Sequence, residues 1–123
     1  MRRLVVATIV ALATGLVSIG TASAVGPALT AGIGSLSCGT WTRERGQGGT
    51  QADIDKEWIL GFVTGVNWDR ATTPTSRGSL LGQGIDTTAW FVFVDNYCLT
   101  HPVDSVLKAA INLIRELEQR AAQ

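Results

Sequence analysis

The two cysteines of this chain constrain its fold more than any other feature. Cys38 and Cys98 are the only cysteines among 123 residues, so no thiol is left over if they pair. In an oxidising compartment this predicts a disulfide between them. The bond would close a loop of about 60 residues, for which chain entropy gives about 4 kcal/mol of stabilisation. That is a large share of the roughly 5 to 15 kcal/mol by which domains are stable.

The N-terminus has the pattern of a secretory signal peptide. Arg2 and Arg3 precede an apolar run over residues 4–19, and residues 22–24, Ala-Ser-Ala, have the form that signal peptidase requires. The run is shorter than the roughly 20 residues of a membrane-spanning helix, which favours cleavage after residue 24 over retention as an anchor. No cysteine directly follows the run, so no lipid anchor is expected. We therefore expect a protein of the periplasm or the extracellular medium.

The charge of the mature chain limits its partners. Cleavage removes two of the ten basic residues and none of the ten acidic ones, which leaves 99 residues with a net charge of −2. This length permits one small domain. A slightly acidic surface has no broad attraction for a nucleic-acid backbone or an anionic membrane, so neither is expected as a partner.

No metal or cofactor motif is evident. Cys98 and His101 have the spacing of half a metal site, and equally of a thiol nucleophile beside its base, but zinc needs three or four ligands and the chain has one histidine. Gly82 and Gly84 lack the further glycine and the lysine of a phosphate-binding loop. We expect no metal and no cofactor, and the favoured role of Cys98 is the disulfide.

Composition divides the mature chain into three parts. Residues 25–37 are rich in Gly, Ala and Ser, which predicts a flexible leader. A single helical domain is expected over residues 38–119, with a polar loop at 43–49, and a frayed tail over residues 120–123.

The first convincing helix begins at Thr50 or Gln51, where Thr50 and Asp53 resemble a capping box. Its residues at helical spacing predict one buried stripe: Ile54, Trp58, Gly61, Phe62, Gly65 and Val66. Gly61 and Gly65 each cost about 1 kcal/mol relative to alanine inside a helix. We expect that they let another helix of the domain approach closely. The alternative is a backbone groove for a binding partner.

The remaining elements predict an all-α fold. Residues 67–85 indicate a long central loop, which is the most suspect binding segment because such loops are often functional. Residues 87–99 favour a helix capped by Asp86, with a buried strand as the alternative. The last helix is expected to start at Thr100 or His101 with Pro102 in its first turn, and its apolar face holds Val103, Val106, Leu107, Ala110, Ile111, Ile114 and Leu117. We expect a small bundle of three main helices with one disulfide.

Six residues are candidates for function. Trp41 and Trp68 lie beside polar sequence, where each is either a partly exposed interface anchor or a cover over a thin core. Asp69, Asp86 and Asp95 flank the long loop and the helix after it, and paired carboxylates of this kind can serve general acid–base chemistry. His101 is the only imidazole, and a capping or surface role is favoured for it. The structural roles favoured for Asp86 and Asp95 are an N-cap and a hydrogen-bond acceptor.

The order of Cys38, the helix around residues 58–66, Asn96-Tyr97-Cys98, Pro102 and a final amphipathic helix resembles two groups of small exported bacterial proteins. One is the HdeA acid-stress chaperone family, and the other is the Tai-type immunity family of type VI secretion. The resemblance covers roughly residues 38–117. The long loop departs from the chaperone pattern, and immunity proteins commonly have further cysteines.

Both families imply a non-enzymatic helical module that binds another protein, either an unfolding client or a toxin. We therefore expect an exported protein-binding module, and the sequence leaves a homodimer open. The alternative is a small exported hydrolase or ligand-binding enzyme that uses the carboxylates around residues 67–85 together with His101.

Overall fold

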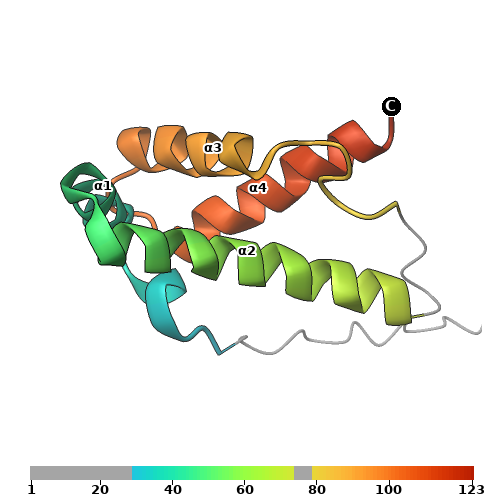
Figure 1. The fold of residues 1–123 in the computed structure, drawn as a ribbon, viewed down its shortest axis with the longest axis horizontal. Helices are drawn as coiled ribbons and strands as arrows, with labels where there is room; N and C mark the ends of the chain where they lie inside the picture. The colour runs from blue at the N-terminus through green and yellow to red at the C-terminus, as the bar shows by residue number, and fades with distance from the viewer. Residues whose placement is uncertain (1–28, 74–78) are drawn as a thin grey trace, which may run out of the picture.

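The computed structural model describes residues 29–73 and 79–123, and this part of the chain is all-α (Figure 1). Its elements are a 3₁₀-helix η1 and four α-helices: η1 Gly32–Ser35, α1 Cys38–Gln47, α2 Gly49–Thr72, α3 Thr87–Thr100 and α4 Val106–Ala121. The all-α prediction is confirmed, with four helices in place of three. The predicted disulfide joins Cys38 at the start of α1 to Cys98 in the last turn of α3.

Helix α1 replaces the polar loop predicted at residues 43–49. Ser37 caps it by accepting a hydrogen bond from the Thr40 backbone N–H to its Oγ, and the helix ends at Gly48, whose φ is +69°. Only Cys38 and Trp41 are buried among its ten residues, so its apolar periodicity is too weak to identify from sequence.

The leader predicted at residues 25–37 is partly wrong, because residues 32–35 form η1. Gly34 is buried beneath the ring of Trp58, and a Cβ at position 34 would lie 2.2 Å from Trp58 Cζ2. The indole N–H of Trp58 also donates to the carbonyl oxygen of Ala31, at 3.1 Å. Residues 25–28 and the predicted signal peptide lie outside the described residues.

Helix α2 is longer than predicted and begins one residue earlier. Its N-cap is Gly48, with no side-chain hydrogen bond, so the predicted capping by Thr50 is wrong. It continues to Thr72, so residues 67–72 of the predicted long loop are helical. The side chain of Asn67 in α2 is hydrogen-bonded to the backbone of Leu81 in the shortened loop. It accepts from Leu81 N at 2.7 Å and donates to Leu81 O at 3.1 Å.

Helices α3 and α4 differ in how well their starts were predicted. Asp86 caps α3 as expected, accepting from the Thr88 backbone N–H at 2.8 Å, and the strand alternative is wrong. The cap of α4 is Ser105, not Thr100 or His101, so Pro102 precedes the helix and Val103 is 93% exposed instead of lying on its apolar face. Helix α4 extends to Ala121, into the tail predicted to fray.

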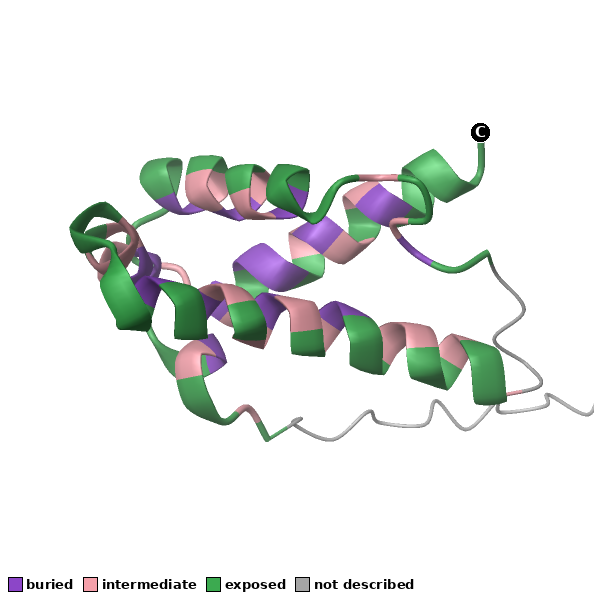
Figure 2. Ribbon diagram, viewed as in Figure 1, coloured by how far each residue is buried: buried purple, intermediate pink, exposed green. Residues whose placement is uncertain are grey.

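The core lies where the inner faces of the four α-helices meet (Figure 2). Its largest fully buried apolar side chains are Trp41, Ile59, Leu113, Val63, Val94 and Val106. Trp58, Phe62 and Val66, which the sequence placed in the buried stripe, are only partly buried against it. In the described part of the chain, no helix is both long enough and apolar enough to cross a membrane.

Candidate functional site

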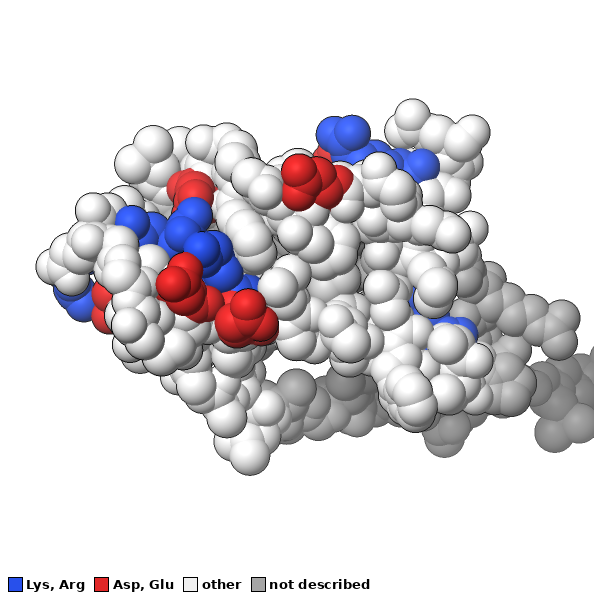
Figure 3. Space-filling model, in the orientation of Figure 1, with Lys and Arg blue, Asp and Glu red and all other residues white. Residues whose placement is uncertain are grey.

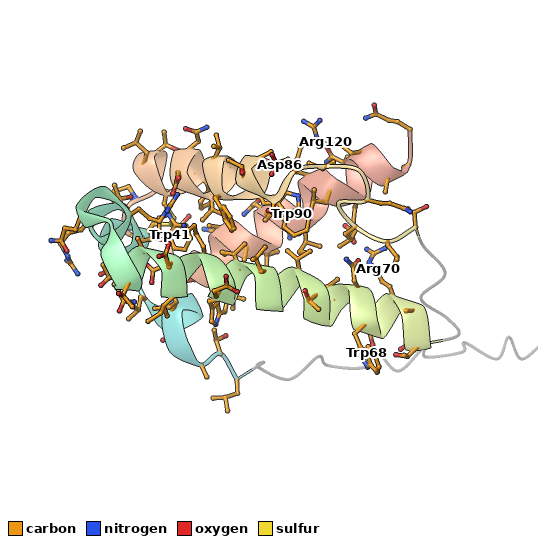
Figure 4. The ribbon with its side chains drawn as sticks, in the orientation of Figure 1. Trp41, Trp68, Arg70, Asp86, Trp90 and Arg120 are labelled. Atoms are coloured by element: carbon orange, nitrogen blue, oxygen red, sulfur yellow. A yellow bond between two sulfur atoms is a disulfide. The ribbon has the colours of Figure 1, made fainter. Side chains whose placement is uncertain are left out.

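One face of α2 exposes large apolar side chains at both ends and glycine between them. Ile54 is 49% exposed and Trp68 is 72% exposed. Gly61 and Gly65 lie between them on the same side of the helix, because the successive spacings of seven, four and three residues keep one face. Trp68 points away from the helix bundle (Figure 4).

Three of the six residues of the predicted buried stripe, Ile54, Gly61 and Gly65, lie on this face and are turned toward solvent. The buried residues of α2 are Ala52, Asp55, Ile59 and Val63, so the true inner stripe is rotated from the predicted one. Among the described residues, a Cβ at Gly61 or Gly65 would meet nothing within 4 Å. The expected close approach of another helix is therefore wrong for the four α-helices that the structure describes, and none of them needs these two glycines for its packing.

An apolar groove adjoins the exposed face. It has a volume of about 350 Å³. It is lined by three residues that precede η1 and by residues of α2 and α4: Leu29, Thr30, Ala31, Trp58, Phe62, Leu107 and Ile111. The rings of Trp58 and Phe62 stack with centroids 5.4 Å apart. Trp58 is four residues from Ile54 and Phe62 is three from Gly65, so groove and face are continuous around the helix. We call the two together the α2 surface.

The charges next to Ile54, Gly65 and Trp68 are acidic. Asp53 and Glu57 are exposed near Ile54, and Asp69 is exposed beside Trp68. The Lys56 ammonium, 2.6 Å from Asp53, lowers the pKa of that carboxyl by a hydrogen bond and by its charge. Arg70 points toward α4, where it pairs with Glu118 (Figure 4).

Most charged side chains of the face drawn in Figure 3 lie at the α1 end, and a second group lies at the top toward the end of α4. The surface over the C-terminal half of α2 is mostly uncharged in this view.

Trp41 and Asp95 form a structural cluster with Arg45. The Trp41 ring is buried, and its indole N–H donates to Asp95 Oδ1 at 2.7 Å. Arg45 donates to both oxygens of the same carboxylate, at 3.0 and 2.9 Å, and this hydrogen bonding raises the pKa of Arg45. Of the two roles considered for Trp41, the structure gives it the one in the core.

The other candidates lie apart from one another. Asp86 and His101 stand at opposite ends of α3, about 20 Å apart along a helix of this length. Asp69 is near the end of α2 and accepts from Thr73 Oγ1 at 2.9 Å. His101 stacks on Tyr97 with ring centroids 4.3 Å apart. The fold brings these side chains to no common centre.

A buried carboxylate was missed by the sequence reasoning. Asp55 is fully buried on the inner face of α2, where Gln51 Nε2 donates to its Oδ1 at 2.8 Å. No sequence signal singled it out, because Asp55 lies among the acidic residues of the first turns of α2 and outside the predicted stripe. Within residues 29–73 and 79–123, no group of three or more His, Cys, Asp and Glu residues could hold a metal ion.

A second hollow lies beside the shortened loop. It has a volume of about 550 Å³ between residues 79–85 and the end of α4, and Arg120 stands at its edge, paired with Glu116 at 2.7 Å. Its remaining lining mixes loop backbone with Leu80, Ile85 and Leu117 and holds no acid–base pair.

Comparison of the chain with protein-family models, with curated proteins and with solved structures found no match.

Proposed function

We propose that this protein is an exported, non-enzymatic module that binds another protein through its α2 surface. The observation that carries the proposal is the exposed line of Ile54, Gly61, Gly65 and Trp68, with nothing within 4 Å of either glycine's Cβ position. Single exposed apolar residues are ordinary, but a continuous apolar face beside a groove marks an interaction site.

The two glycines are the strongest part of this argument. Each lowers helix stability by about 1 kcal/mol relative to alanine, and neither is needed for packing against residues 29–73 and 79–123. A helix face without side chains lets another backbone approach closely, as small residues do at helix–helix contacts. Trp68 and the Trp58–Phe62 pair provide the large apolar contacts that dominate binding energies.

The setting of the protein is inferred from its covalent chemistry. A disulfide between Cys38 and Cys98 suits a non-reducing compartment. Together with the signal-like pattern of residues 1–24, it supports a location in the periplasm or outside the cell. The enzymatic alternative has less support, because Asp69, Asp86, Asp95 and His101 do not converge.

The test is a matched pair of glycine substitutions. Gly61→Leu fills the α2 surface, whereas Gly46→Leu adds the same side chain to α1 at a position that is equally open. Both changes favour helix, so neither should unfold the protein. Each tagged variant is expressed in the native host, and the proteins that it retains from the exported fraction are identified.

We expect the wild type and Gly46→Leu to retain the same partner and Gly61→Leu to lose it. Equal retention by Gly61→Leu would show that the α2 surface is not the binding site.

A further inference from the structure

We infer that the partner of the α2 surface is a basic amphipathic helix, with an apolar stripe bordered by lysines or arginines. The inference rests on the proposed function and adds the chemistry of the partner. It follows from three features of the surface: its shape, the sign of the charges beside it, and the exposed indole of Trp68.

The shape selects a helix. Gly61 and Gly65 are four residues apart, so together they open a shallow notch between the side chains of neighbouring turns. A ridge of side chains on a second helix fits such a groove. The face from Ile54 to Trp68 spans about 21 Å at 1.5 Å per residue, which corresponds to about four turns of a partner helix.

The carboxylates beside the α2 surface favour a partner helix with basic residues along its apolar stripe. Glu57 is three residues after Ile54 and four before Gly61, and Asp69 is four after Gly65, so both carboxylates border the notch. Neither has an ion-pair partner within 4.0 Å among the described residues. Of the two cations on α2, Lys56 already pairs with Asp53 and Arg70 with Glu118.

Trp68 adds a second attraction for cations. Its ring is 72% exposed, and Asp69 follows it in the sequence. The face of an indole attracts ammonium and guanidinium groups, most strongly where a partner also excludes water. One lysine or arginine of the partner can therefore contact the Trp68 ring while another pairs with Asp69. A second copy of this chain is a poorer occupant, because its own α2 surface would bring the same acidic border.

The test uses two synthetic peptides of about 18 residues, or five helical turns. Both have leucines along one face, and they differ only in having lysines or glutamates beside that face. Binding of each labelled peptide to the disulfide-bonded protein is measured by fluorescence anisotropy at low and high salt. Sedimentation velocity of the protein alone reports self-association.

We expect the lysine peptide to bind about tenfold tighter than the glutamate peptide at low salt, and the difference to shrink at about 0.5 M salt. The double variant Glu57→Gln with Asp69→Asn should weaken lysine-peptide binding about fivefold, which is the effect of two exposed charge pairs. The control Glu116→Gln neutralises a carboxylate on α4 that pairs with Arg120, and it should change the affinity less than twofold.

Equal binding of both peptides, or binding of neither, would overturn this inference. So would a dimer of the protein that Gly61→Leu disrupts, because the occupant would then be a second copy. In each case the proposed function is judged separately, by whether Gly61→Leu loses the partner captured in the native host.

Discussion

The disulfide end of the molecule and the α2 surface use their side chains in opposite ways. Near the disulfide, two carboxylates are held by partners within the chain: Asp95 accepts from Trp41 and Arg45, and Asp104 accepts from Tyr97 at 2.7 Å and Lys108 at 2.9 Å. On the α2 surface, apolar side chains and acidic groups face outward. The contrast separates what the chain uses for folding from what it leaves for another molecule.

Backbone contacts strengthen the contrast. The N–H of Cys38 donates to Asp104 O at 2.7 Å, and the N–H of Gly39 donates to Pro102 O at 2.9 Å, so the start of α1 is fixed to the turn before α4. A Cβ at Gly61 or Gly65, on the other hand, would meet nothing within 4 Å in the part of the chain that the structure describes. Substitutions in the two regions should therefore change the free energy of unfolding in opposite directions and by different amounts.

The largest effect should come from removing the disulfide. Replacing Cys38 and Cys98 together by alanine should lower the free energy of unfolding by about 4 kcal/mol, because the unfolded chain regains the freedom of a loop of about 60 residues. Urea denaturation of both proteins measures this. A loss below about 1 kcal/mol would mean that the bond contributes little and that the packing around it holds this end alone.

A smaller loss is expected from Asp95→Ala. The variant leaves the buried indole N–H of Trp41 and the Arg45 guanidinium without their acceptor, and we expect a cost of about 1 to 2 kcal/mol in urea denaturation. Asp69→Ala is the control, because that carboxylate is exposed, and it should cost about 0.5 kcal/mol or less. If Asp95→Ala and Asp69→Ala lost similar amounts of stability, the Asp95 carboxylate would be no more important for folding than an exposed one.

The α2 surface should respond in the opposite direction. Gly61→Ala is expected to raise the free energy of unfolding by about 0.5 to 1 kcal/mol, since the new methyl group meets nothing and helix propensity improves. Gly34→Ala should instead destabilise the protein, because its Cβ would overlap the Trp58 ring. A destabilised Gly61→Ala would show that this glycine serves the fold after all.

The pH dependence of stability should report the Asp104 cluster. The hydrogen bond from Tyr97 and then that from Lys108 lower the pKa of Asp104 from its ordinary 3.8. A carboxyl with a lowered pKa stabilises the fold above its unfolded pKa and loses that contribution as pH falls through the folded value.

Unfolding free energies measured from pH 5 downward should therefore decline below about pH 4. They should decline less steeply in Asp104→Asn, with Tyr97→Phe between the two. An identical slope in wild type and Asp104→Asn would contradict this role.

The sequence predicted the disulfide and one of the three helix starts that it assigned to a capping residue. The disulfide follows from the cysteine count, and the start of α3 follows from the capping residue Asp86. Helix α1 could not be predicted, because only two of its ten residues are buried. The start of α4 was misplaced because Pro102 suits a first helical turn, whereas here it precedes the Ser105 cap.

The sequence anticipated only part of the candidate site. It offered Trp68 as a possible interface anchor and a backbone groove at Gly61 and Gly65 as an alternative, but it placed Ile54 in the buried stripe. Because the apolar residues of α2 show only weak helical periodicity, the pattern alone does not tell which stripe is buried. The groove was not predictable, because it joins α2 to Leu107 and Ile111 of α4 and to residues before η1. Only the packing of η1 under Trp58 creates it.

The central claim is that partners contact the α2 surface and not the disulfide end. It is tested most directly by photo-crosslinking in the native host, with a photoreactive residue at Thr64 on α2 or at Val103 beside the disulfide. Both positions are exposed, and Val103 is itself apolar, so exposure does not distinguish them. We predict an adduct with another protein from position 64 and none from position 103. An adduct from position 103 alone would contradict the account.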